Sequence, residues 1–361
     1  MMKRCLVAAF LVCSALGVAA QQRPSVTSAG TYKVPRTPDG QPDLQGFWTN
    51  LTYTPFERPR DLAAKPFYTE QEAIAAFNRA IADSQDQIVH YVNGDFGATP
   101  VQTGARPNLR TSLVIDPPDG RVPPLVPDVQ KRDQARMAAD KARGPLPLTW
   151  RDDRGTAWCV FHDRAIPAVV APYGSNYHLV QSRDFISLTY EWNTERRIIR
   201  LDGRPRGSES VPESVPTYAG DSRGHWEGDT LVVETMNFTP KRSFLGSPGT
   251  PPATQGSPAL RLVERFTRTA DDTIVHTYTV TDPNTWTRPW TVELPMHRIN
   301  GPMLEYACNE NNQDGFGTLK NARAQEEGRI PPPEAMRRGD AKAAIADRAD
   351  EAKVIGGQEA K

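Results

Sequence analysis

The chain has 361 residues, in which 43 lysines and arginines balance 43 aspartates and glutamates. Loss of a leading segment with Lys3 and Arg4 would leave 41 basic residues and a net charge of about −2. This balance argues against a nucleic-acid-binding protein and against attachment by charge to an anionic membrane surface. The 33 prolines and 26 glycines favour short strands joined by turns over a helical protein.

Residues 1–20 have the composition of a secretory signal peptide. The basic start MMKR precedes the apolar run CLVAAFLVCSALGV, and the small residues Val18-Ala19-Ala20 suit cleavage. The apolar run is shorter than the roughly 20 residues that a membrane-spanning helix needs. We therefore expect an exported protein, periplasmic or secreted, without a membrane span.

The cysteines Cys159 and Cys308 lie outside this leading segment. In an oxidising compartment such a pair most simply forms one disulfide bond. A bond that closes a loop of about 150 residues would stabilise the fold by about 4–5 kcal/mol in the chain-entropy model. Two buried free thiols are the alternative.

The first half of the mature chain has few strand signals. Residues 21–45 are polar and turn-rich, which predicts an extended leader, and GFWTNLTYT at 46–54 has strand composition. Thr69 and Glu72 form a capping-box pattern before helically spaced apolar residues. We expect 46–157 to comprise this strand, that helix, a second helix over 128–143, a brief strand RTSLVI, and loops, all packed on the domain that follows.

From about residue 158 the pattern changes to short strand-like segments separated by turns, which is typical of an antiparallel barrel or sandwich. Residues 158–312 are predicted to form a mainly β domain, an antiparallel lipocalin-like barrel or sandwich. A charged helical or disordered tail is predicted at 313–361. The candidate strands read YHLVQS, FISLTYEW, RRIIRL, DTLVVETMNF, ALRLVERFTR, TIVHTYTVT, PWTVELPM and PMLEYAC.

The stretch SRGHWEGDTLVVE at 222–234 has two interpretations. The glycine of the Glu-Gly-Asp corner can take a positive φ, so the stretch can be a hairpin with Trp226 packed at the barrel end. Alternatively, His225 and Glu227 form an acid–base pair at the mouth of a pocket. Neighbouring strand residues point to opposite faces, so His225 and Trp226 both face inward only if the corner is bulged.

Just upstream, GDSRG matches the G-x-S-x-G pattern of serine hydrolases around Ser222. A nucleophile elbow requires an apolar strand before the serine and a helix after it. Here VPTYA precedes the motif and a hairpin follows it. A serine hydrolase is therefore the weakest of the functional readings.

The main catalytic candidates lie in the hairpin predicted over 260–281. Glu264 shares a face with leucines and Phe266, whereas His276 and Tyr278 share a face opposite a row of threonines and should point inward. Burial would raise the pKa of an inward Glu264, and an interior Glu and His within reach form a candidate acid–base pair.

The register of this hairpin decides whether Glu264 and His276 share a face. A four-residue connection places Glu264 opposite Thr277, whereas a three- or five-residue connection moves it to the histidine face. Both registers stay open, as does a purely structural interpretation with a salt-bridged carboxylate and a satisfied core histidine.

Further candidates for a ligand pocket in the β-rich half are Tyr190, Arg197 and His178. No pair of histidines has helical metal-ligand spacing, and neither Cys-x-x-Cys nor a phosphate loop or dinucleotide fingerprint occurs. We expect neither a metal nor an organic cofactor.

Six stretches between about residues 35 and 328 stand out together: PDGQPDLQGFWTN, TPFERP, RTSLVIDPPDGRVPPL, DSRGHWEGDTLVVET, DPNTWTRPWTVELPM and EYACNENN. They resemble a broad group of exported bacterial proteins of unassigned activity. The WEGDTLVV hairpin and the meander after it also resemble lipocalin-like barrels. That resemblance implies a cavity for a small, largely apolar ligand, and some such barrels are hydratases, lyases or isomerases.

Two functions from different classes follow. The first is a small-molecule-binding barrel in which Glu264, His276 and Tyr278 carry out acid–base chemistry of the lyase, hydratase or isomerase type. The second is a non-catalytic, envelope-associated binding or structural protein. The sequence leaves open whether the protein is an enzyme.

Overall fold

The computed structural model describes residues 32–91, 105–143, 175–204, 215–245 and 250–303, together with residue 305 and isolated positions from 317 to 329. The predicted signal segment, Cys159, Cys308 and most of the predicted tail lie outside the described residues. Export and the disulfide bond therefore stay predictions. No described helix is both long and apolar enough to cross a membrane.

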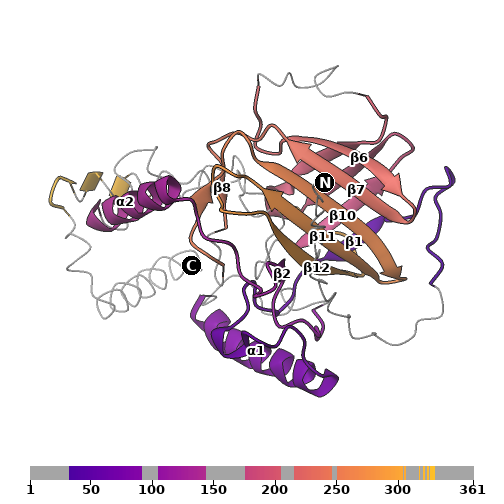
Figure 1. Cartoon of the computed structure of the whole chain (residues 1–361), viewed down its shortest axis with the longest axis horizontal. Coiled ribbons are helices and arrows are strands. Elements are labelled where there is room, and N and C mark those ends of the chain that lie inside the picture. Colours follow the sequence, from indigo (N-terminus) through magenta and orange to yellow (C-terminus); the bar gives the residue numbers. More distant parts are fainter. Residues whose placement is uncertain are drawn as a thin grey trace, which may run out of the picture. The chain divides into compact units, whose positions relative to one another are not determined.

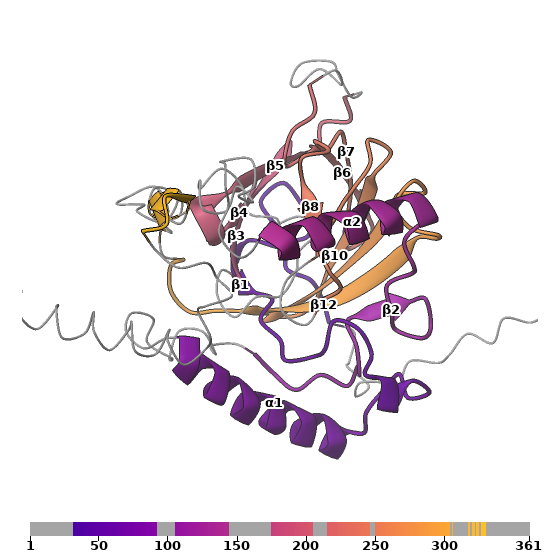
Figure 2. The ribbon, with the colours of Figure 1, turned by 90° about the vertical axis from the view of Figure 1, so that its left-hand side faces the viewer.

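Nine of the described strands close into a barrel; Figure 2 shows the strands arranged round a ring, and Figure 1 shows one side of the barrel wall. Hydrogen bonding between the first and last strands of the ring closes it. In ring order the strands are β1 (Gly46–Thr49), β3 (Asn176–Gln181), β4 (Phe185–Tyr190), β5 (Arg196–Arg200), β6 (Asp221–Glu227), β7 (Thr230–Met236), β10 (Arg261–Ala270), β11 (Thr273–Thr281) and β12 (Trp290–Arg298).

The prediction of a mainly β barrel is confirmed, but this barrel is mixed rather than antiparallel. Strands β5 and β6 run parallel, with Ile199 beside Ser222, whereas the other neighbouring pairs of the ring are antiparallel. A parallel pair needs a crossover connection instead of a tight hairpin. The turn-based reading of the sequence assumed hairpins throughout and missed this crossover.

Strand β1 belongs to the barrel wall. Its Trp48 lies opposite Tyr177 of β3 on one side and Arg298 of β12 on the other, and the Trp48 side chain is fully buried. The strand was predicted, but as part of the region packed on the barrel. The short strand β2 (Val114–Asp116), which was also predicted, pairs with β12.

Both predicted helices are present. Helix α1 (Glu70–Tyr91) begins at the predicted capping box: the Thr69 N–H donates to Glu72 Oε2 at 2.8 Å, and the Glu72 N–H donates to Thr69 Oγ1 at 3.3 Å. Helix α2 (Pro127–Arg143) begins with a proline, whose missing N–H costs nothing in the first turn.

A small second sheet follows strand β7 in the chain. Strand β8 (Ser243–Phe244) pairs with β9 (Thr254–Gln255). Helix α2 binds this sheet, since Arg132 donates to Thr254 Oγ1 at 3.2 Å and Arg136 donates to the Ala253 carbonyl at 2.7 Å.

Alternation of buried and less buried side chains defines the barrel interior. In β11, Ile274, His276, Tyr278 and Val280 are buried, and the residues between them are only half-buried. Buried and less buried side chains also alternate along β10 and along most of β12. The sequence pattern therefore places both apolar and ionisable side chains inside the ring.

Candidate functional site in the barrel interior

A bulge in β10 settles the register of the β10–β11 hairpin. Glu264 pairs with Tyr278, but the register shifts between Arg268 and Ala270 before the turn. An extra residue in one strand exchanges the two faces for the residues beyond it. Of the two registers that the sequence left open, the structure has the one in which Glu264 and His276 share the inner face.

Five consecutive strands of the ring each direct one polar side chain inward. We call these five residues the interior polar cluster. Each of them is at most 3% exposed, so their polar groups are removed from bulk water. The members are Arg197 of β5, Ser222 of β6, Thr235 of β7, Glu264 of β10 and His276 of β11.

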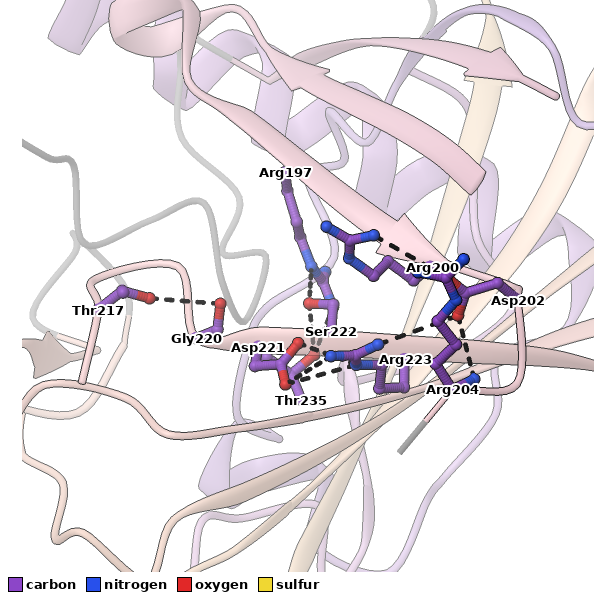
Figure 3. Close-up of polar contacts among 10 residues, drawn as sticks. All are labelled: Arg197, Arg200, Asp202, Arg204, Thr217, Gly220, Asp221, Ser222, Arg223 and Thr235. Atoms are coloured by element: carbon purple, nitrogen blue, oxygen red, sulfur yellow. Dashed lines mark hydrogen bonds and ion pairs between the residues drawn. The ribbon is translucent and has the colours of Figure 1, made fainter. Parts of the chain in front are cut away.

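The guanidinium of Arg197 is the centre of the cluster. Its Nε donates to Ser222 Oγ at 2.8 Å, and its Nη2 donates to Thr235 Oγ1 at 2.6 Å; Figure 3 shows Arg197 with these two residues. The same Nη2 also donates to Glu264 Oε2. The two hydroxyls lie 3.0 Å apart and hydrogen-bond each other. Side chains of three other strands therefore hold one buried cation through charge-assisted hydrogen bonds.

Ser222 is a supporting residue of this cluster. It lies within β6, and a hairpin follows it, as the sequence context predicted. Among the described residues its hydroxyl contacts Arg197 and Thr235, and no histidine is among its hydrogen-bond partners. A nucleophilic serine needs a base within hydrogen-bond reach, so these contacts do not favour a serine hydrolase.

The carboxyl group of Glu264 is held in its charged form. Burial by itself would raise its pKa, as the sequence analysis expected. The charge of Arg197 and the hydrogen bonds from His276 and Arg197 outweigh burial and lower this pKa to about 2. The expectation of a raised pKa is wrong because the buried carboxylate has a buried cation as its partner.

This carboxylate fixes the orientation of His276. The His276 Nε2 lies 3.2 Å from Glu264 Oε1, and an ionised carboxylate can only accept hydrogen bonds, so Nε2 is the nitrogen that donates. In the neutral imidazole the lone pair is then on Nδ1. The ring also stacks on Phe266, with 4.1 Å between ring centres and 8° between planes. Two contacts thus fix one tautomer and one ring position.

Two donor groups beside the cluster have no partner among the described residues. The Tyr278 hydroxyl and Arg197 Nη1 are both buried without a hydrogen bond. Burial, and then the charge of Glu264, raise the pKa of Tyr278 well above its usual value, so its hydroxyl keeps its proton. Because buried polar groups are rarely left unpaired, these donors call for a water molecule or a ligand.

Tyr190 and Tyr177 extend the polar interior round the barrel. The Tyr190 hydroxyl interacts electrostatically with Arg197, and the Tyr177 hydroxyl accepts a hydrogen bond from Asn50 Nδ2 at 2.7 Å. The predicted inward positions of His276 and Tyr278 agree with the structure, and the candidates Tyr190, Arg197 and Glu264 are buried as well.

Three of the other predicted pocket residues lie elsewhere. His225 and Glu227 are within 3.2 Å of each other, but both side chains are at least half exposed. They belong to the outer face, where Arg265 also donates to Glu227 at 2.8 Å. His178 is only half-buried and stacks on Phe47, outside the cluster.

The corner after His225 is the predicted hairpin turn. Gly228 has φ +59°, a conformation that other residues adopt only at a cost. Trp226 is partly buried and packs against the core, as that interpretation required. Neighbouring residues of a strand point to opposite faces, so Trp226 points to the core while His225 points to solvent.

Thr235 was not predicted as a site residue, and Ser222 was predicted only as a nucleophile. Both are polar residues at inward positions of otherwise apolar alternation, and they pair with each other across β6 and β7. A search for polar residues on the predicted inner face would have found them.

Among the described residues, no group of three or more His, Cys, Asp or Glu side chains could hold a metal ion. Comparison of the chain with protein families, with curated proteins and with solved structures finds no match in any of the three. The resemblance to exported bacterial proteins and to lipocalin-like barrels therefore remains a prediction from the sequence motifs.

Proposed function

We propose that the barrel interior binds a small, largely apolar organic molecule with an acceptor oxygen, and that Glu264 and His276 transfer a proton on it. One observation carries this proposal: a fully buried Arg–Glu–His cluster lies next to buried donors that have no described partner. In this proposal the protein acts outside the cytoplasm, as its signal-like first segment predicts.

The energetic cost of the cluster supports a functional role. Moving each ion out of water costs several kcal/mol, and well-packed apolar residues in place of a buried ion pair are often as stable or more stable. Leu262 and Ile199 lie two positions from Glu264 and Arg197 on the same strands and belong to the hydrophobic core, so the ion pair has apolar surroundings. Strongly perturbed, buried ionisable groups are concentrated at functional sites.

The proposed chemistry assigns a separate role to each group. The Nδ1 of His276 takes a proton from a carbon next to a carbonyl group. The C–H electron pair then forms a C=C bond, and the π pair of the carbonyl group moves onto its oxygen to give an enolate. Tyr278 and Arg197 Nη1 donate hydrogen bonds to this oxygen as its charge develops. Glu264 stabilises the imidazolium, which then returns the proton to another carbon or to a leaving group.

Hydrogen–deuterium exchange tests this reaction class. The protein is incubated in D₂O with acetophenone, cyclohexanone and related ketones, and proton NMR follows the loss of the α-proton signal. We expect wild type to accelerate exchange for at least one ketone and His276→Ala to abolish the acceleration. His225→Ala is the matched control, because that histidine also lies 3.2 Å from a glutamate but is exposed.

The second candidate is a non-catalytic binding or structural protein. It is favoured by the hydrogen bonds that Ser222 and Thr235 accept from Arg197, since they satisfy much of the guanidinium without any ligand. Wild-type exchange no faster than buffer for every ketone would contradict the proton-transfer proposal. A small molecule found with the protein by native mass spectrometry would then favour binding alone.

A further inference from the structure

A cleft of about 320 Å³ lies between α1 and two loop segments, 53–59 and 106–110. None of the residues that line it belongs to the interior polar cluster. Its volume is at the lower end of the range for small-molecule sites, about 300–1,000 Å³. This cleft is therefore a second place where the protein can hold a small ligand.

One wall of the cleft is apolar and comes mainly from α1. Ala73, Ala76 and Ala80 follow the spacing of a single helix face, and their small side chains leave space beside the helix. Phe77 is next to them and meets Tyr53 edge to face, with 5.6 Å between ring centres. A flat or compact apolar group fits against this wall.

The remaining lining residues are mostly hydrogen-bond donors. Three arginines border the cleft. Arg110 pairs with Glu293, and Arg106 pairs with Asp272 at 2.8 Å, so acidic residues that do not line the cleft neutralise both. Arg79 forms no ion pair with any side chain that the structure describes. The cleft therefore has at its wall one arginine without an ion pair, with the carboxylate of Asp83 one helical turn away on α1.

Tyr68 provides a neutral donor in the same cleft. Burial, and then the charge of Asp61, raise the pKa of its hydroxyl, which therefore stays protonated. Arg79 lies close enough to lower this pKa in part, and it lines the same cleft. Asp83 lies one helical turn after Arg79 and also borders the cleft. Its carboxylate disfavours a ligand with a second negative charge.

We propose that this cleft binds a small monocarboxylate with an aromatic or compact apolar body. The carboxylate accepts hydrogen bonds from Arg79 and Tyr68, and the body packs against Ala76 and the Phe77–Tyr53 pair. A guanidinium suits a carboxylate because it can offer two parallel N–H groups. This site is independent of the proton-transfer chemistry in the barrel.

Isothermal titration calorimetry with phenylacetate tests the proposal, with the neutral phenylacetamide as the matched ligand. We expect phenylacetate to bind about tenfold more tightly, since only the charged ligand can form a charge-assisted hydrogen bond with Arg79. In Arg79→Gln, phenylacetate should bind no better than the amide. Arg183→Gln changes an exposed arginine on the turn between β3 and β4 and should leave both affinities unchanged.

Two further variants locate the ligand. Ala76→Phe fills the space beside α1 and should abolish binding of both compounds, with an unchanged thermal midpoint as proof of folding. His276→Ala should leave phenylacetate binding intact, which separates this site from the barrel interior. Equal affinities for the two compounds, no detectable binding of phenylacetate, or full affinity in Arg79→Gln would overturn the proposal.

Discussion

Glu264 and His276 contact each other diagonally across the β10–β11 hairpin, since Glu264 is paired directly with Tyr278 and not with the histidine. The bulge near Ala270 makes this contact possible. The same two strands therefore bring a carboxylate, an imidazole and a phenol to one inner face.

Loss of the Arg197 side chain should be severely destabilising. Arg197→Met leaves Glu264 buried without its cation, and breaking one partner of a buried ion pair costs about 3–5 kcal/mol. The double variant Arg197→Met/Glu264→Leu removes both charges and should recover most of this loss. Urea unfolding of the two single variants and the double variant gives the coupling energy. A coupling energy near zero would contradict the structure of the cluster.

The pH dependence of stability should contain a contribution from Glu264 at low pH. Its folded pKa of about 2 lies below the usual value of 4.5, so the folded state is favoured above pH 4.5 and loses this advantage as the pH falls toward 2. Unfolding free energies measured between pH 7 and pH 2 should show the loss, and Glu264→Gln should lack it. An unchanged pH profile in Glu264→Gln would show that the carboxylate is not held in its charged form.

His297 should produce a separate contribution at higher pH. Burial and then the charge of Arg106 lower its pKa from 6.5 to about 4, despite the opposite effect of Asp272. Between pH 6.5 and 4 the histidine is therefore protonated in the unfolded state but not in the folded state. The free energy of unfolding has its full value above pH 6.5 and decreases as the pH falls from 6.5 to 4. His297→Gln should flatten this window, whereas the exposed His225→Gln should leave it as in wild type.

Several features of the fold could be predicted from local sequence patterns. The capping box at Thr69 and Glu72 identified the start of α1, and the threonine row opposite His276 identified the inner face of β11. Both signals operate over a few neighbouring residues. The crossover between β5 and β6 and the role of β1 in the barrel depend on contacts between distant segments, which local patterns do not specify.

The low pKa of Glu264 could not be predicted from the sequence for the same reason. Its pKa depends on Arg197, which is 67 residues away in sequence and three strands away round the ring. The bulge was equally hard to predict, because a shift of one residue exchanges the two faces and either register satisfies the apolar pattern of β10. The sequence could identify the candidate residues but not their electrostatic relationship.

Tyrosine-to-phenylalanine substitutions at Tyr177 and Tyr278 should show how a hydrogen-bonded hydroxyl and one without a described partner differ in their effect on stability. Tyr278 has a buried hydroxyl without a described partner, so Tyr278→Phe should change the unfolding free energy by less than about 1 kcal/mol. Tyr177→Phe removes the acceptor for Asn50 Nδ2 and should cost about 1–3 kcal/mol, since it leaves a buried donor unsatisfied. The two residues are equally buried phenols, which makes each the control for the other.

The same pair of variants tests the proposed chemistry. If the Tyr278 hydroxyl stabilises a developing negative charge, Tyr278→Phe should lower the rate of ketone exchange about 100-fold while the protein stays as stable as wild type. Tyr177→Phe should keep most of the exchange activity at a temperature where it remains folded. A Tyr278→Phe protein with full exchange activity would exclude this hydroxyl as the oxygen-binding donor, and Arg197 Nη1 would then be the remaining candidate.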